Sequence, residues 1–538
     1  MVDTQSSNFG YSTATEDAAI SARDTSTVLI IGAGMGGLAA SIRLAAAGRR
    51  VAVFDRAAAP GGKLRAVAVA GRAIDAGPTV VTMRHVFDDL LRAAGTSLAA
   101  ELRLAPLDVI ARHHWQDGTR LDLRQTAEAS EAAILAAFGP HAAGEFATFC
   151  RRSRALYDAL DAAFMRNPSP DLLDLGRRTG VAGLLALSRA SPFASLWSVL
   201  GRRFTDPRLR QLFARYATYS GASPFAAPAT LMLIAHAEQR GVWTIEGGMT
   251  MLASALMRAA GRHGARFHLG APVAEVLTDG ARVRGVRLAD GSEIAGRTVI
   301  AAGEIGAIAA GSLGAAARAA LGRAAAAPRS LSAVTWQVVA HARGFPLSHH
   351  NVFFSRDYPA EFAALAAGTL PTDPTIYVCA QDRTQHRPQD RMLDRMPDRM
   401  LDRGGPGPAD RNAGAAAERL LVLVNAPPLG DRAAPDDAAT DACWARVRAR
   451  LAAAGLTLDI VGSAVTGPPG FERLFPGAGG ALYGRDLAGW RDPFARPRAR
   501  TALPGFYLAG GSAHPGPGLP MAALSGSFAA AAIMADTE

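Results

Sequence analysis

Hydrophobic and polar positions over residues 27–56 alternate in blocks that predict a strand, a helix and a second strand. Val28–Ile31 is an uninterrupted apolar run, which is typical of a strand buried on both faces. A helix is expected over Leu38–Ala47, and the apolar run over 51–54 predicts a second strand that ends at Asp55. Because glycines fill the turn between the first strand and the helix, this block predicts a βαβ unit.

The glycine-rich turn of this unit indicates a dinucleotide site. Gly32 permits a tight turn, Gly34 lets the backbone approach a pyrophosphate, and Gly37 lets helix and strand pack closely. The start of the helix then directs free amides and the positive end of its dipole at the phosphates. Asp55 follows about 20 residues later, where a carboxylate can accept hydrogen bonds from ribose hydroxyls.

The next segment favours FAD over NAD. Gly61 and Gly62 let the chain pass close to a cofactor, and Lys63, the only lysine of the chain, or Arg65 can offset phosphate charge. An acidic residue followed by a Gly-Gly pair and a basic residue resembles the second flavin motif of the amine oxidase and phytoene desaturase superfamily. An ordinary glycine turn with a solvated lysine is the structural alternative.

The remaining pattern predicts an α/β fold in which the chain passes several times between two domains. A Rossmann-type FAD-binding domain is expected beside an interleaved α+β substrate domain. The segment Asp390–Arg403 repeats Asp-Arg-Met and suits a solvated loop. The expected division is a disordered leader over 1–26, the FAD-binding domain over 27–85, 240–303 and 500–538, and the substrate-binding or lid domain over 86–239 and 304–499, with a flexible insert over 384–412.

Composition limits the other partners. The formal net charge is +10, but the arginines are spread along the chain without aromatic residues between them, which argues against nucleic acid binding. Three widely separated cysteines suit neither a disulfide framework nor a zinc site, so a reducing cytoplasm is expected.

No apolar run reaches the roughly 18 residues that a membrane-spanning helix needs. The most apolar long segment, Val181–Leu200, is interrupted by Arg189 and Pro192. It is interpreted as a core helix followed by a turn, or as a segment that dips into a membrane surface. In the second case the arginines beside it would meet anionic headgroups and its apolar side chains would enter the acyl boundary. The arginines are Arg177, Arg178, Arg202 and Arg203, and the apolar side chains are Leu184, Leu185, Phe193 and Trp197.

Three further segments carry a family resemblance. Asp75–Phe87 contains Gly-Pro-Thr followed by Met-Arg and Val-Phe, Arg215–Met249 begins with Arg-Tyr-Ala-Thr-Tyr, and Gly505–Ala523 contains His-Pro-Gly-Pro-Gly. Together they resemble the bacterial carotenoid desaturases, especially the 1-hydroxycarotenoid 3,4-desaturases, also called methoxyneurosporene dehydrogenases. The resemblance is weaker after Thr298, where Ala302-Gly303-Glu304 replaces the Asn or Asp that often follows in that family.

The resemblance implies an FAD-dependent desaturase. Such an enzyme forms a carbon–carbon double bond in an acyclic carotenoid by transferring a hydride to flavin N5, and oxygen or a quinone reoxidises the flavin. The resemblance further implies a cytoplasmic protein attached peripherally to the inner or intracytoplasmic membrane. The expected cofactor-binding residues are Gly32, Gly34, Gly36, Gly37, Asp55, Arg56, Gly62, Lys63, Gly77, Pro78, Thr79, Val273, Gly510, Gly511, Pro520, Met521 and Ala522.

Catalytic residues are not determined by these motifs, and no metal site is expected. The polar groups on or beside the motifs are candidates, although a structural role is the alternative for each of them. The alternatives within the family are a phytoene-type desaturase and a carotenoid isomerase. The alternatives outside it are a flavin amine oxidase and a non-enzymatic binding protein on the same fold. The candidate catalytic residues are Arg84, His85, His236 and His514, with Glu238 beside them.

Overall fold

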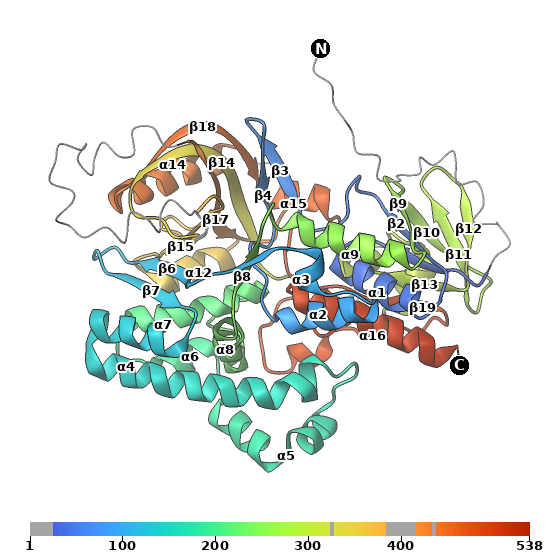
Figure 1. Ribbon diagram of the computed structural model, residues 1–538, viewed down its shortest axis with the longest axis horizontal. Helices are drawn as coiled ribbons and strands as arrows, with labels where there is room; N and C mark the ends of the chain where they lie inside the picture. Colours follow the sequence, from blue (N-terminus) through green and yellow to red (C-terminus); the bar gives the residue numbers. More distant parts are fainter. Residues whose placement is uncertain (1–24, 323–327, 384–415, 433–436, 538) are drawn as a thin grey trace.

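The computed structural model describes residues 25–322, 328–383, 416–432 and 437–537, which form two lobes joined along their length (Figure 1). The predicted leader lies almost wholly outside these residues, and the whole of the predicted insert, Asp390–Arg403 included, lies outside them. Those two expectations therefore stay predictions.

A parallel sheet of five strands forms the centre of the first lobe. Its strand order is β19-β13-β1-β2-β9, and every neighbouring pair is parallel. The apolar run of β1 is buried on both faces, as its composition predicts. The strand order brings the C-terminal strand into the same sheet as the N-terminal βαβ unit, which confirms the predicted fold class. The strands are β1 (Val28–Ile31), β2 (Val51–Asp55), β9 (Arg266–Leu269), β13 (Thr298–Ala301) and β19 (Phe506–Leu508).

Helices cover one face of this sheet. They share one apolar core with Ile30 and Val53, and α16 packs along α1 through small residues. Among the described residues α16 alone is long and apolar enough to span a membrane, but half of it is buried in the protein, so it is a core helix. The helices are α1 (Met35–Ala46), α2 (Arg84–Ala93), α3 (Leu98–Glu101), α9 (Thr250–Arg262) and α16 (Leu519–Asp536).

The opposite face of the sheet is covered by a small antiparallel sheet and two short helices, which pack on Leu29 and Phe54. The packing of α2 on one face and of these helices on the other extends the nucleotide lobe past the expected limits at residues 85 and 303. The elements are β10 (Val273–Thr278), β11 (Val283–Leu288), β12 (Glu293–Ala295), α10 (Ile305–Ala309) and α11 (Gly314–Ala320).

A seven-stranded sheet of order β18-β14-β17-β16-β15-β6-β7 forms the second lobe. All neighbours in it are antiparallel except β6 and β15. Helix α14 (Asp437–Ala453) covers one face through Cys443, Val447 and Leu451, and α12 (Tyr358–Ala366) packs beside the sheet. The strands are β6 (Val109–His114), β7 (Arg120–Arg124), β14 (Ser332–Gly344), β15 (His350–Phe353), β16 (Ile376–Ala380), β17 (Glu418–Ala426) and β18 (Leu456–Thr466).

A helical layer lies below this sheet in Figure 1. The helix followed by a turn that is predicted over Val181–Leu200 is present, since α5 ends at Arg189 and the chain turns before α6 begins, but this helix does not lie in the core. Most of α5 stands at the surface, where it leaves large apolar side chains exposed. The layer contains α4 (Ala127–Leu160), the π-helix η1 (Asp161–Met165), α5 (Leu172–Arg189), α6 (Leu196–Gly201), α7 (Pro207–Ala214), the 3₁₀-helices η2 (Arg215–Ser220) and η3 (Ala229–Met232), and α8 (Leu233–Gln239).

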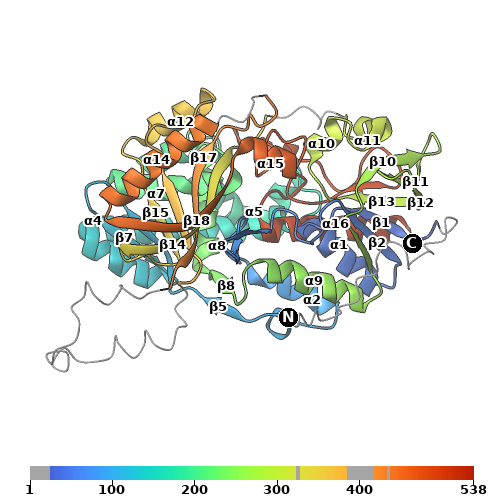
Figure 2. The ribbon, with the colours of Figure 1, turned by 90° about the horizontal axis from the view of Figure 1, so that it is seen from above.

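Short elements connect the lobes, as Figure 2 shows from above. The hairpin of β3 (Ala66–Val69) and β4 (Arg72–Asp75) follows the flavin motif and packs on β14, β17 and β18 of the other lobe. The polypeptide thus passes from the expected cofactor site directly onto the large sheet. The remaining elements are β5 (Leu104–Pro106), β8 (Trp243–Ile245), α15 (Pro468–Leu474) and the 3₁₀-helix η7 (Asp492–Ala495).

Candidate flavin and substrate site

The start of α1 has the properties of a phosphate-binding helix terminus. Gly34 is its N-cap, and no side chain of the described residues accepts a hydrogen bond from the free amides of the first turn. A Cβ at Gly34 would meet no atom of the described chain within 4 Å. A Cβ at Gly37, in contrast, would lie 1.9 Å from the carbonyl oxygen of Gly32. Gly37 therefore serves close helix–strand packing, and the surroundings of Gly34 suit a bound anion.

Asp55 fixes the glycine-rich loop. One carboxylate oxygen accepts a hydrogen bond from the amide of Ala33 at 2.6 Å, and the other accepts from the amide of Ala57 at 2.7 Å. The carbonyl of Asp55 accepts from the amide of Ala271, two residues before Val273. A carboxylate has further acceptor capacity, so the ribose contact stays a prediction. Arg56 is exposed and donates to the carbonyl of Arg473 at 3.3 Å.

Lys63 joins two segments that are far apart in the sequence. Its Nζ donates to Glu304 at 2.5 Å and to the carbonyl of Leu482 at 2.6 Å. Glu304 also accepts from the hydroxyl of Ser512 at 2.5 Å, and a Cβ at Gly77 would lie 1.9 Å from the carbonyl oxygen of Lys63. The lysine charge is therefore balanced by Glu304. This glutamate lies in the segment after Thr298 where the sequence departs from the pattern of the family that it resembles.

The C-terminal segment reaches the same region. Gly510 donates its amide to the hydroxyl of Ser525 at 3.2 Å, and the carbonyl of Gly511 accepts from Arg496 at 3.3 Å. Arg496 is only 3% exposed, and burial lowers its pKa to about 10. No motif singled out this arginine. Pro520, Met521 and Ala522 lie in the first turn of α16.

A cavity of about 770 Å³ lies between the lobes. One wall is made by the segments Gly77–Thr79 and Gly518–Met521. Both belong to motifs that are expected to contact the flavin. The opposite wall is one face of the large sheet, with Val352, Leu421 and Leu423. Its volume is within the range of small-molecule sites, roughly 300–1,000 Å³.

The cavity reaches the surface at α5. Leu172, Leu184 and Phe193 lie on its wall, although 56%, 49% and 75% of each remains exposed. These side chains therefore form its rim. Trp197, predicted to lie with them, instead packs on Phe225 and under the guanidinium of Arg210, which is 3.7 Å from the centre of its indole ring.

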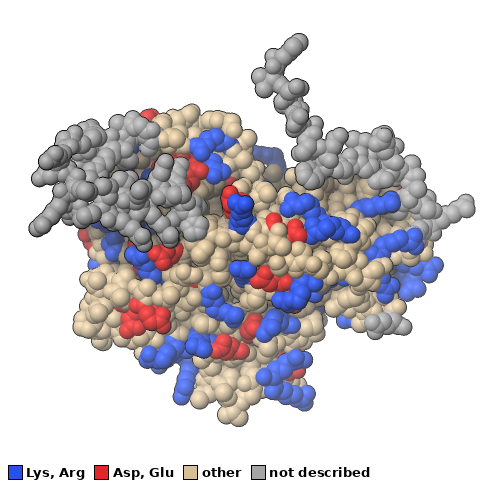
Figure 3. All heavy atoms as spheres, viewed as in Figure 1, with Lys and Arg blue, Asp and Glu red and all other residues tan. Residues whose placement is uncertain are grey.

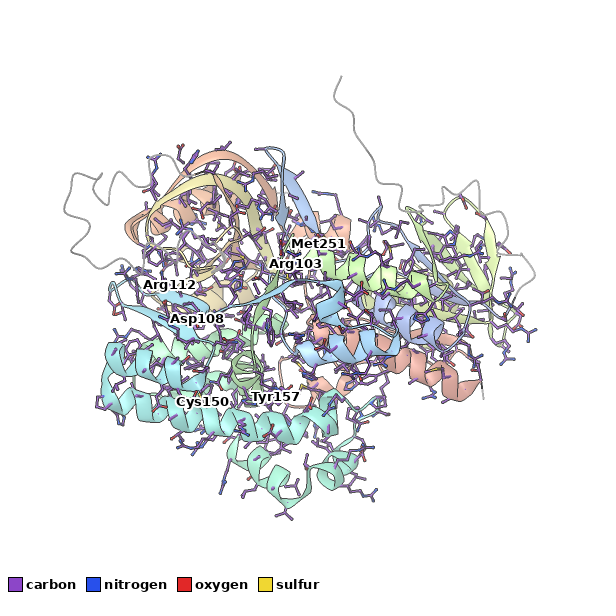
Figure 4. All side chains as sticks on the ribbon, in the orientation of Figure 1. Arg103, Asp108, Arg112, Cys150, Tyr157 and Met251 are labelled. Atoms are coloured by element: carbon purple, nitrogen blue, oxygen red, sulfur yellow. The ribbon has the colours of Figure 1, made fainter. Side chains whose placement is uncertain are left out.

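The four catalytic candidates are absent from the wall that the described residues form. Arg84 donates to Asp88 at 3.1 Å, and His85 lies half-buried near Arg240, where burial lowers its pKa. His236 packs edge-on against Tyr157 of α4, which Figure 4 labels. His514 is buried, its Nε2 lies 2.8 Å from the carbonyl oxygen of Asn167, and burial lowers its pKa to about 4.

Glu238 does lie on the wall, together with polar residues that the motifs did not single out as site residues. Arg215 and Tyr219 belong to a recognised motif but carried no assigned role. His350 and Tyr377 lie on β15 and β16. The sequence did not indicate that they are site residues, because an isolated polar residue in an apolar strand is not distinctive.

Comparison with known proteins matches residues 35–344 to the family of flavin containing amine oxidoreductases. The hydroxyneurosporene desaturase of Rubrivivax gelatinosus is 46% identical over 519 residues, which cover 96% of this chain and 94% of the relative. The hydroxyneurosporene desaturase of Cereibacter sphaeroides is 45% identical over 515 residues, with coverages of 95% and 97%. A solved putrescine oxidase triple mutant has a TM-score of 0.58 at 14% identity, with coverages of 95% and 99%, and is similar in fold.

Proposed function

This chain belongs to the flavin-containing amine oxidoreductase family and, within it, to the carotenoid desaturases, and we propose that it desaturates an acyclic 1-hydroxy carotenoid with FAD as cofactor. The bond oxidised is C3–C4, in a 1-hydroxy carotenoid or in a 1-methoxy carotenoid. The observation that carries this proposal is the cavity, because it joins the expected flavin segments to a long apolar surface that opens at α5.

The residues of the nucleotide lobe fit FAD. The uncapped start of α1 supplies free amides for the pyrophosphate, and the close backbone packing of Gly36, Gly62 and Gly77 leaves this region without side chains between its segments. When bound, FAD would accept a hydride from one carbon, and the proton lost from the adjacent carbon would pass to water or to a basic side chain, which leaves the double bond.

The cavity walls supply orientation and exclusion of water. Aliphatic side chains of the large sheet, such as Val352, Leu421 and Leu423, hold a hydrocarbon chain by burying its surface. A polyene needs no strong acid or base to be bound, which agrees with the position of the four candidate residues away from the wall. The chain's task is to hold one bond of the substrate beside Gly77–Thr79 and to keep water away from it.

The charges on the wall argue against a flavin amine oxidase. Four described lining residues are basic: Lys63 is balanced by Glu304 and Arg215 by Glu238, which leaves the charges of Arg65 and Arg496 on the wall. A protonated amine would meet a net positive wall and lose its hydration, which is unfavourable. A neutral hydrocarbon does not meet this penalty.

The rim of the cavity supports uptake from a membrane surface. Leu173 and Val181 of α5 are 77% and 85% exposed, and Arg177 and Arg178 of the same helix are also exposed. Figure 3 shows a largely uncharged surface over α5 with basic side chains beside it. Such a surface suits insertion among acyl chains with arginines at anionic headgroups. The proposed place of work is therefore the cytoplasmic face of the inner or intracytoplasmic membrane.

The proposal is tested by expressing the chain in cells that accumulate 1-hydroxyneurosporene and recording pigment absorption. A longer polyene shifts the absorption to the red, and a variant without flavin leaves it unchanged. If a flavin-loaded protein produces no shift, the proposed activity is excluded. Turnover without oxygen, with and without an added quinone, identifies which of the two reoxidises the flavin.

A further inference from the structure

A group of polar side chains interrupts the otherwise apolar wall of the cavity. We call Arg215, Tyr219, His350 and Tyr377 the polar cluster. Arg215 and His350 are 8% and 4% exposed, and all four side chains line the cavity. Because buried polar groups are costly unless they are hydrogen-bonded, their partners show what the cluster can bind.

One half of the cluster is internally balanced. Arg215 donates to the hydroxyl of Tyr219 at 2.8 Å, and the neighbouring Tyr216 donates its hydroxyl to Glu238 at 2.7 Å. Burial raises the pKa of Glu238, while the Arg215 charge opposes that shift. The guanidinium therefore has a buried carboxylate nearby, and this half does not require an anionic ligand.

The other half is a chain of hydrogen bonds that ends at a nitrogen with no partner. The hydroxyls of Thr79 and Tyr377 are 2.8 Å apart, and the Tyr377 hydroxyl is 2.7 Å from Nδ1 of His350. Nε2 of His350 has no hydrogen-bond partner among the described residues, and the same holds for Nε of Arg215 and the hydroxyl of Tyr358. These three buried atoms belong to residues on the wall of one cavity.

The electrostatic environment restricts the ligand to a neutral group. Burial lowers the pKa of His350 well below its ordinary value, and the Arg215 charge lowers it further. The ring is therefore neutral, with one nitrogen that donates and one that accepts. A hydroxyl can satisfy either nitrogen because it both donates and accepts, and it can accept from the Arg215 guanidinium at the same time.

A metal ion is the competing occupant. His349, His350 and Cys379 have ligand atoms within 4.8 Å of one another. However, Sγ of Cys379 makes a hydrogen-bond contact of 3.6 Å with Nε2 of His349, so these two atoms already have a partner in the protein. The Arg215 charge, near enough to lower the pKa of His350, also repels a cation.

We propose that the polar cluster binds the tertiary hydroxyl of the carotenoid and so selects both the substrate and the bond that is oxidised. This inference rests on the proposed function. Thr79 connects the cluster to the Gly77–Thr79 segment, which is expected beside the flavin. In a 1-hydroxy carotenoid C3 is two bonds from the carbon that carries the hydroxyl. A hydroxyl held by His350 therefore places C3–C4 beside that segment, and the polyene extends along the apolar wall toward α5.

The test compares two substrates that differ only in this hydroxyl. Purified holoenzyme in liposomes is assayed for kcat/KM with 1-hydroxyneurosporene and with neurosporene, for the wild type and for His350→Phe. We expect the wild type to prefer the hydroxylated substrate by at least about 100-fold, since a site built to bind a hydroxyl rejects the analogue that lacks it. His350→Phe should lose at least about tenfold on 1-hydroxyneurosporene and change little on neurosporene.

Val352→Ala is the matched control, because Val352 lies on the same strand and the same wall but is apolar. It should lower both rates by a similar factor. If His350→Phe fails to fold or to bind flavin, Tyr377→Phe replaces it, since it removes only a hydroxyl and should show the same selective loss.

Three results would overturn the inference. The first is equal wild-type rates on both substrates, and the second is an equal loss on both substrates in His350→Phe and Tyr377→Phe. The third is activity that is lost on chelation and restored by zinc, which would assign His350 to a metal. Failure of the proposed function has a different signature, because the wild type would then convert neither substrate.

Discussion

A Cβ placed on Gly36 would lie 2.7 Å from the Cα atom of Gly510, although these glycines come from opposite ends of the chain. Gly36 is in the first turn of α1, and Gly510 follows β19. The two backbones meet because β13 lies between β1 and β19 in the parallel sheet. Two segments expected to bind the cofactor are thus in direct contact before any ligand is considered.

The first prediction follows from that contact. Gly36→Ala forces the start of α1 away from Gly510, and overpacking of this kind costs about 1–3 kcal/mol. The variant should melt at a lower temperature and lose flavin on purification. Gly261→Ala is the control, because Gly261 is in α9 with no described atom within 4 Å of its added Cβ. Equal melting temperatures and flavin contents in the two variants would contradict the contact.

Gly34→Val tests the phosphate site separately from stability. Gly34 has φ −72° and ψ 178°, which a β-branched residue adopts readily, and an added Cβ meets no described protein atom within 4 Å. The variant should keep its free energy of unfolding within about 0.5 kcal/mol but purify without flavin, since the side chain would collide with the pyrophosphate. Flavin absorbance per protein measures this, and a stoichiometric spectrum would refute the site.

The third prediction concerns membrane attachment through α5 and the turn after it. Val181 and Phe193 are 85% and 75% exposed, so changing both to Ser should leave the fold intact. Loss of two apolar side chains, each worth about 1.5–3 kcal/mol when fully buried, should weaken binding to anionic liposomes at least tenfold. Binding of the wild type should also fall with rising salt. Both effects are measured by liposome flotation.

Its control makes the same change elsewhere. Val461 and Val465 of β18 are 56% and 53% exposed, and β18 lies across the molecule from α5 (Figure 1). Val461→Ser with Val465→Ser should bind liposomes as the wild type does. If both double variants bind equally, α5 is not the docking surface.

A pH dependence follows from His514. Burial lowers the pKa of His514 to about 4 in the folded protein, whereas an unfolded histidine titrates near 6.5. Between these values the unfolded chain binds more protons, so stability is fully present above about pH 6.5 and is lost as the pH falls toward 4. His514 alone can contribute up to about 3 kcal/mol. His514→Gln, which can still donate to Asn167, should flatten this dependence in denaturant titrations, and an unchanged slope would contradict the assignment.

The sequence was sufficient for the nucleotide lobe because its signals are local. The first strand, the glycine turn, the helix and Asp55 lie within one continuous segment. An apolar run such as Val28–Ile31 also indicates a strand that is buried on both faces. The same reasoning could not find Glu304 as the partner of Lys63, because their contact depends on how distant strands are ordered. It also misplaced Trp197, since an apolar side chain near the surface can face either way.

The polar cluster is the part of the site that the sequence was least able to predict. Its members come from η2, β15 and β16, and Thr79 joins it from the segment after β4. Each is an ordinary polar residue in its own segment. Only the three-dimensional arrangement shows that they surround one cavity and leave buried nitrogen atoms with no partner in the described part of the chain.

The most direct test of the central claim is a single turnover without oxygen. Purified holoenzyme in liposomes is mixed with one equivalent of 1-hydroxyneurosporene, and flavin and carotenoid absorption are followed together. If the chain transfers a hydride from the carotenoid to its flavin, the flavin band bleaches in step with the appearance of a longer polyene, one flavin for each new double bond. A flavin that stays oxidised in the presence of the carotenoid, although dithionite bleaches it, would rule out this hydride transfer.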